Sequence, residues 1–243
     1  MRNTKPMIFN SVMMNALLLG NKRATCRPIS YKSEDGKASV FLPTEAKYMA
    51  RMPLRGKLYC RFEDDGDRMW HIAVPYHKDD VMVARETWRV AEQVGENSVR
   101  IEFAADGHIS NAIEFSPDRM AMMQKYVSKD RAKWNPAIYM PNEAARVKRR
   151  IKSCMPIQIQ YLSAEDILDE GICKWEDDMC GTRYAPANRT GEAPILPVNG
   201  CPLTLAYAMG MVWDDTLSPS DATQIGYMYN PWVWHIEFGE TVL

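Results

Sequence analysis

A short polar segment near the N-terminus carries the side chains best suited to chemistry. It runs from Asn21 to Arg27 and includes Lys22 and Thr25, an ammonium and a hydroxyl three positions apart. A partly desolvated lysine has a lowered pKa and accepts a hydroxyl proton, while an arginine stabilises a developing oxyanion. The same residue types are also typical of a solvated strand rich in charge. The residues alone therefore leave a reactive pocket and a plain surface strand as open interpretations.

The elements around this segment predict that it connects a helix to a strand. Ser11 is a suitable N-cap, and the apolar residues between Val12 and Leu18 stay near one helical face. Gly20 ends that helix, and Pro28 prevents another from forming. Side chains on such a connection are free to face a cavity.

The rest of the chain predicts a mixed α+β fold with many short strands, as a small barrel requires. A hairpin is expected around Glu63–Asp67, and a long bent strand over 146–161. Further strands are expected at 81–84, 99–103 and 232–238, and helices at 118–129, 163–171 and 204–213. In the last strand, alternation places Trp232 and Trp234 on one face. One domain spanning 1–243 is predicted, with an irregular insertion at 31–57 and a long loop at 173–202.

Composition narrows the possible classes of protein. The 30 Lys and Arg residues balance 31 Asp and Glu residues, so the chain is unlike proteins that coat nucleic acid. Six cysteines and four histidines are scattered without metal-ligand spacing, so no metal or other cofactor is expected and free thiols are predicted. The chain shows no secretory signal and no apolar run long enough to span a membrane. A cytoplasmic location is expected, and oligomeric state is left open.

Several separated blocks resemble the ASCH-domain proteins of the PUA-like superfamily, especially a version common in bacteriophage genomes. The signature block is Gly20-x-Lys22-x-x-Thr25-x-Arg27. The other blocks, in chain order, are Lys5–Asn10, Val83–Trp88, Trp134–Arg146, Glu165-Asp166 with Glu170-Gly171, and Asn230–Phe238. The resemblance implies a PUA-like mixed β-barrel with peripheral helices, into which the two insertions are set.

Some ASCH proteins are amidohydrolases that remove the acetyl group from the exocyclic nitrogen of acetylcytidine. By position, the resemblance implies Lys22, Thr25 and Glu170 as the catalytic set of a hydrolase for an acylated or otherwise modified cytosine nucleoside. Lys22 would deprotonate Thr25 to give an acyl-enzyme, with Glu170 protonating the departing amine. Direct activation of water by Glu170 is equally permitted. Alternatively, Glu170 is only an exposed residue at the end of a helix.

Further residues are candidates for binding the substrate. Arg27 would stabilise an oxyanion, and Glu86 would pair with Arg27 or Lys22, or else form a structural salt bridge. Trp88 and Trp134 would stack on a base, although tryptophans of this kind are more often core residues. Cys26 is interpreted as a packing residue.

A concentrated basic run supports a second class of function. Lys148, Arg150 and Lys152 share one face of the predicted strand, where they would contact phosphate or simply face solvent. If they border the pocket while Glu170 points away, the chain is a non-catalytic module that binds RNA or a modified base. A phage accessory protein that binds a host protein is a third hypothesis. A metal-assisted ribonuclease is the weakest, since no carboxylate or histidine cluster supports it.

Overall fold

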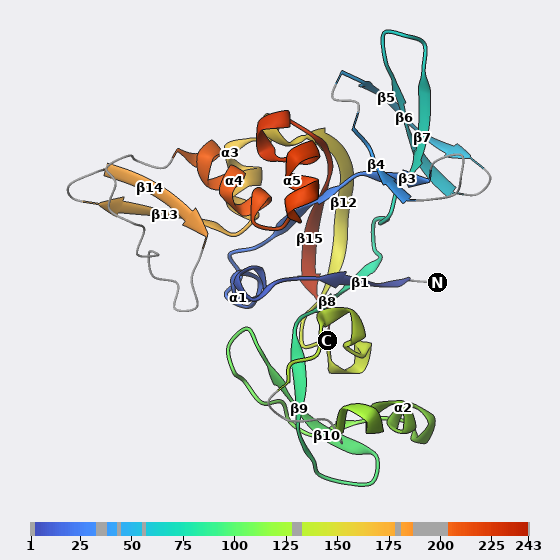
Figure 1. Ribbon diagram of the computed structural model, residues 1–243, viewed down its shortest axis with the longest axis vertical. Coiled ribbons are helices and arrows are strands. Elements are labelled where there is room, and N and C mark those ends of the chain that lie inside the picture. Colours follow the sequence, from blue (N-terminus) through green and yellow to red (C-terminus); the bar gives the residue numbers. More distant parts are fainter. Residues whose placement is uncertain are drawn as a thin grey trace.

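The computed structural model describes residues 3–32, 38–42, 45–54, 57–127, 133–177, 181–186 and 204–242. Strands dominate this part of the chain and form several sheets, with a few short helices packed around them (Figure 1). The prediction of a mixed α+β fold is therefore confirmed.

A five-stranded sheet occupies the centre of the molecule, in the order β1-β8-β12-β15-β2 (Figure 1). Only the β1–β8 pairing is parallel. The strands are β1 (Thr4–Ile8), β2 (Ala24–Pro28), β8 (Val81–Arg85), β12 (Lys148–Gln158) and β15 (Trp232–Thr241). The strands predicted at 81–84, 146–161 and 232–238 are thus present. Among the described residues, β1 and β2 are the two edges of this sheet and no pairing between them closes a barrel.

The two faces of the central sheet are covered by different hydrophobic clusters. Trp232, Trp234 and Ile236 of β15 pack into a cluster that also holds Phe9 after β1, whereas Val233 packs into a cluster with helices α3, α4 and α5. Alternate residues of a strand face opposite sides of its sheet, which explains this division. The three helices are Ala164–Asp169, Leu205–Asp214 and Pro219–Ile225. They confirm the helices predicted at 163–171 and 204–213.

A smaller unit lies at one end of the central sheet, where β9, β10 and β11 form a second sheet against helix α2 (Figure 1). Their bounds are β9 (Trp88–Gln93), β10 (Ser98–Phe103), β11 (Ile113–Glu114) and α2 (Pro117–Val127). The predicted strand at 99–103 is confirmed, and so is the helix at 118–129 over its described part. Trp88, Met120 and Met123 are buried in the core of this unit.

The segment 31–57 is not irregular, contrary to the prediction. The described parts of this segment contribute to two small antiparallel sheets, β3-β4 and β5-β6-β7. The strands are β3 (Ser30–Lys32), β4 (Ala38–Val40), β5 (Lys47–Leu54), β6 (Lys57–Glu63) and β7 (Met69–Ala73). Most residues of β5 are exposed, so it lacks the apolar alternation that reveals a strand in a sequence. The predicted hairpin around Glu63–Asp67 is confirmed as β6 and β7.

The loop predicted at 173–202 also contains regular structure. Strands β13 (Ile172–Asp177) and β14 (Gly181–Pro186) form an antiparallel hairpin beside α4. Residues 178–180 and 187–202 of the predicted loop lie outside the described residues. No helix in the described ranges is long and apolar enough to cross a membrane. The remaining elements are α1 (Ser11–Leu18) and short 3₁₀ helices at Ala137–Tyr139, Asn142–Ala144, Ile159–Tyr161 and Tyr227–Tyr229.

Candidate functional site

The turn after α1 brings Lys22 beside the end of α3. The side chain of Asn10, not the predicted Ser11, caps α1 by accepting a hydrogen bond from the amide of Met13. Gly20 then adopts a φ of +78°, and the amide of Lys22 donates to the carbonyl of Ala16. This turn lets Lys22 form an isolated antiparallel bridge with Glu170, far along the chain.

Helix α3 presents Glu170 to that bridge. Its start is fixed by the predicted capping box, in which the Ser163 hydroxyl accepts from the Asp166 amide and the Asp166 carboxylate accepts from the Ser163 amide. Glu170 is the C-cap, and Gly171 follows with a φ of +94°. A Cβ atom at Gly171 would lie 2.9 Å from Ala16 Cβ and 3.3 Å from Lys22 Cβ. Glycine therefore allows the close approach of the two segments.

Lys22 and Glu170 form a buried ion pair. Lys22 Nζ lies 2.5 Å from Glu170 Oε2 and 2.8 Å from the Glu170 carbonyl oxygen, and the two side chains are 0% and 2% exposed. An ammonium has three hydrogens, so one donor of Lys22 stays uncommitted among the described residues. Glu170 Oε1 is buried and has no hydrogen-bond partner in the same set. Within the pair itself, one donor of Lys22 and one acceptor of Glu170 are thus uncommitted.

Thr25 is close to this pair in sequence but belongs to the other face of the sheet. It lies directly opposite Ile236 in the β2–β15 ladder, and directly opposed residues share a face. Ile236 packs in the cluster with Phe9, away from the helices α3 to α5. The Thr25 hydroxyl is fully buried and has no hydrogen-bond partner among the described residues. The structure brings Lys22 and Glu170 together and does not place Thr25 between them.

Cys26 is interpreted from the sequence as a packing residue. It lies on the opposite face of the sheet from Thr25 and lines the same cavity as Glu170. It lies opposite His235 in the ladder, and His235 Nε2 is 3.8 Å from Asp166 Oδ1. Burial and then the charge of the Glu170 carboxylate raise the pKa of the Cys26 thiol well above its ordinary value. The thiol is therefore a protonated neighbour of Glu170, rather than a ready nucleophile.

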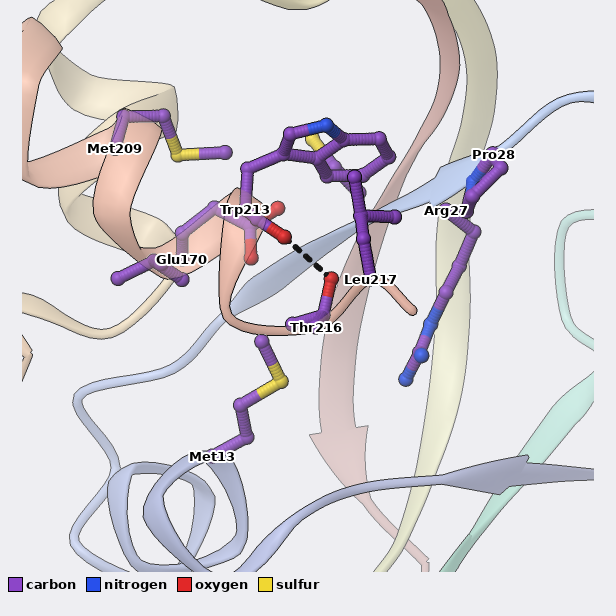
Figure 2. Close-up of a pocket in the computed structure, with 10 residues that line it drawn as sticks. Met13, Arg27, Pro28, Glu170, Met209, Trp213, Thr216 and Leu217 are labelled. Atoms are coloured by element: carbon purple, nitrogen blue, oxygen red, sulfur yellow. Dashed lines mark hydrogen bonds between the residues drawn. The ribbon is translucent and has the colours of Figure 1, made fainter. Parts of the chain in front are cut away.

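A cavity of about 70 Å³ adjoins this face of the sheet. Its lining residues come from α1, β2, the end of α3 and the segment from α4 to Leu217 (Figure 2). They are Met13, Cys26, Arg27, Pro28, Glu170, Met209, Val212, Trp213, Thr216 and Leu217. Glu170 is the acidic residue of an otherwise largely apolar wall.

Arg27 contributes to the cavity lining but its guanidinium extends away from Glu170 (Figure 2). It donates a hydrogen bond to the Ile8 carbonyl and lies 5.2 Å from the centre of the Phe9 ring. Burial lowers the pKa of Arg27, an effect that the charge of Glu170 partly offsets. In this arrangement Arg27 joins β2 to β1 and does not reach the Lys22–Glu170 pair.

Glu86 pairs with neither Arg27 nor Lys22. Both of its carboxylate oxygens accept from Arg146, at 2.8 and 3.0 Å, and Arg146 also binds Asp106. Arg146 additionally lies 4.2 Å from the centre of the Phe103 ring. Burial raises the pKa of Glu86, although Arg146 opposes the shift. Of the two readings of Glu86, the structural salt bridge is the one observed.

The two tryptophan candidates lie with the β9-β10-β11 sheet rather than at the cavity. Trp88 is fully buried and packs against the ring of Tyr126, with ring centres 5.0 Å apart. Trp134 is 38% exposed, and the Arg89 guanidinium stacks over its ring at 4.4 Å. Neither residue lines the cavity that contains Glu170.

The basic run lies on β12, outside the cavity lining. Lys148 and Arg150 are half-buried opposite β8, and Lys152 is exposed. The register with β15 shifts on both sides of Ile151, so the simple alternation expected over this run is interrupted. These residues therefore do not form a rim around the Lys22–Glu170 pair.

The sequence interpretation missed several residues of the site. His235 was detectable in principle, because alternation along 232–238 places it on the face opposite Trp234. Met13, Met209 and Trp213 carry no local signal, since they read as ordinary apolar positions of helices. Among the described residues, no group of three or more His, Cys, Asp or Glu side chains is placed to hold a metal ion.

The sequence matches no known family model, no curated protein and no solved structure. The resemblance to ASCH-domain proteins thus stays a prediction from the sequence blocks.

Proposed function

We propose that this chain is an ASCH-type hydrolase that removes an acyl group from the exocyclic amine of a modified cytosine nucleoside. The proposal rests on the buried contact of 2.5 Å between Lys22 Nζ and Glu170 Oε2, beside a cavity that Glu170 lines. An acid and a base held together out of water, each with unused hydrogen-bonding capacity, are suited to amide hydrolysis.

In the proposed reaction Glu170 is the general base. Its free Oε1 accepts a proton from water while the water oxygen bonds to the acyl carbon. Lys22 does not line the cavity, and its role is to keep the Glu170 carboxylate oriented through their contact. When the carbon–nitrogen bond breaks, Glu170 returns the proton to the cytosine nitrogen. The products are the free amine and a carboxylic acid, so atoms and charge balance.

Activation of water is preferred here to an acyl-enzyme on Thr25. The ladder register puts the Thr25 hydroxyl on the face away from Cys26, whereas Cys26 and Glu170 line the same cavity. A hydroxyl nucleophile needs hydrogen-bond contact with its base, and Thr25 has no partner among the described residues. Thr25 then acts as a buried packing residue of β2.

The position of Glu170 supports hydrolysis over a purely binding role. A module that binds RNA would favour a basic rim, but Lys148, Arg150 and Lys152 are absent from the described cavity lining. The buried Glu170 carboxylate would also repel a phosphate at the cavity.

The test is incubation of the protein with acetylcytidine as free nucleoside, with chromatography for released cytidine. Glu170→Gln should lower kcat/KM by about 10²–10⁴-fold, the usual contribution of a general base. Lys22→Met should lower it by about 10²-fold, because Glu170 loses the group that positions it. Absence of cytidine with the unmodified protein would show that the proposal is wrong.

Two matched variants sharpen this test. Glu165→Gln changes an exposed carboxylate on the same helix and should leave kcat/KM unchanged. Thr25→Val removes the hydroxyl at nearly constant shape and should retain most activity. A loss with Thr25→Val as large as that with Glu170→Gln would instead identify Thr25 as the nucleophile.

A further inference from the structure

The C-terminal part of the chain supplies half of the residues that line the cavity beside Glu170. Helix α4 contributes Met209, Val212 and Trp213, and the turn that follows it contributes Leu217. These four side chains are apolar, and Cys26 of β2 and Glu170 at the end of α3 add a thiol and a carboxylate to the lining. The cavity thus combines one carboxylate with a largely apolar lining.

The apolar residues that α4 contributes to the cavity are held in place by burial and hydrogen bonds. Trp213 is 2% exposed, and its indole nitrogen donates a hydrogen bond of 2.7 Å to the Ile225 carbonyl. The Thr216 hydroxyl donates to the Trp213 carbonyl at 2.7 Å, which closes the turn after α4 (Figure 2). Met209 is 1% exposed and sits in the same core cluster. Enlarging the cavity on this side would disrupt close packing and hydrogen bonds, at a cost in free energy.

The volume of the cavity suits only a few atoms. A water molecule occupies about 10–15 Å³ of such space, so the observed 70 Å³ holds a handful of non-hydrogen atoms. Pockets that enclose whole drug-sized ligands measure about 300–1,000 Å³. A nucleoside cannot be enclosed here, whereas a short acyl group can.

We propose that this cavity is the acyl-binding pocket and that Met209, Trp213 and Leu217 restrict the acyl group to about two to four carbons. This inference rests on the proposed hydrolysis at Glu170. The acyl carbon would lie beside Glu170, its alkyl end would contact the α4 wall, and the cytosine ring would stay outside the cavity. One methylene in an apolar pocket changes kcat/KM by about tenfold or more, so kcat/KM should depend strongly on the length of the acyl group.

The experiment compares kcat/KM for the acetyl, butyryl and hexanoyl derivatives of cytidine. The unmodified protein should prefer acetyl to hexanoyl by at least about 100-fold. Leu217→Ala should raise the rate with hexanoyl at least about tenfold relative to acetyl, and Met209→Ala is a second variant if the first is unstable. Tyr207→Ala, an exposed position on the same helix, should leave the ratio unchanged. Equal rates across chain lengths, or ratios unmoved by both wall variants, would overturn the inference.

A binding measurement separates this inference from the reaction. Met13 and Met209 both line the cavity, so their ¹³C-labelled methyl groups report its occupation by NMR. Acetamide should shift both resonances, and hexanamide should shift neither. If this pattern holds and no cytidine derivative is hydrolysed, the pocket is supported and the proposed hydrolysis is wrong. If hexanamide shifts both resonances as strongly as acetamide, the size restriction is wrong even when hydrolysis occurs.

Discussion

Lys22 Nζ donates to both the side chain and the carbonyl of Glu170, although 148 positions separate the two residues in the chain. The contact joins the turn before β2 to the end of α3, and both side chains are buried. It is at once the proposed catalytic pair and a tertiary link, so its energetics and its chemistry are testable separately.

Loss of either partner should destabilise the fold strongly. Lys22→Met or Glu170→Gln alone leaves an uncompensated buried charge or carboxylate, at an expected cost of about 3–5 kcal/mol in the free energy of unfolding. The double variant should cost clearly less than the sum of the single changes, because no buried charge remains. Urea unfolding of the four proteins measures the coupling, and strictly additive losses would contradict a direct buried pair.

Gly171→Ala should disturb the same contact from the backbone side. Its φ of +94° disfavours any side chain, and the new Cβ would lie 2.9 Å from Ala16 Cβ. Gly107→Ala is the matched control, since Gly107 has a φ of +72° but nothing within 4 Å of its Cβ position. We expect about 1–2 kcal/mol for Gly107→Ala from the backbone alone. Gly171→Ala should cost a further ~1–3 kcal/mol from overpacking and should also lower deacylation. Equal thermal stabilities would refute the close approach.

The neighbourhood of Cys26 and Glu170 is testable through thiol chemistry. Burial is the largest cause of the raised pKa of Cys26, and the charge of Glu170 is the second. Glu170→Gln should therefore lower that pKa and speed alkylation by iodoacetamide. The gain is on the order of tenfold for each pKa unit. Peptide mass spectrometry after timed labelling gives the rate. Cys154, whose pKa burial raises to about 12, reports any general opening, and Glu165→Gln should leave Cys26 unchanged. An unaltered rate with Glu170→Gln would mean that the two groups do not interact.

The Asp80 carboxylate should stabilise the fold at neutral pH and lose this effect in acid. Burial raises the pKa of this carboxyl, but hydrogen bonds from the His77 amide and Lys5 outweigh it and hold the pKa below its ordinary value. A lowered pKa in the folded state stabilises the fold above the ordinary pKa of about 3.9, and this contribution is lost as pH falls through the folded-state value.

Asp80→Asn should therefore cost stability at pH 7 and progressively less below pH 4, as measured by urea unfolding across this range. Asp79→Asn is the control, because Asp79 is exposed and asparagine tolerates its φ of +70°. A cost for Asp80→Asn that is constant from pH 7 to pH 3 would argue against the Asp80 carboxylate as the source.

The local elements can be predicted from the sequence, because their signals lie within a few residues. The Ser163–Asp166 capping box predicts the start of α3, and the alternation over 232–238 predicts a strand with Trp232 and Trp234 on one face. Strand β5 was missed because a mostly exposed strand has no such pattern. The resemblance also named Lys22 and Glu170, but no local signal shows that they touch.

Which side chains share the site depends on long-range strand pairing. The pairing of β2 with β15 sets Cys26 opposite His235 and Thr25 opposite Ile236, so the thiol rather than the hydroxyl faces α3. A shift of one residue in that register would exchange the two faces, and the polar segment alone does not specify its partner strand. The same holds for Glu86, whose partner Arg146 is 60 positions away. The face that a side chain occupies and the partner that it contacts both depend on segments far apart in the chain. These long-range contacts place Lys22 and Glu170 together beside one small cavity.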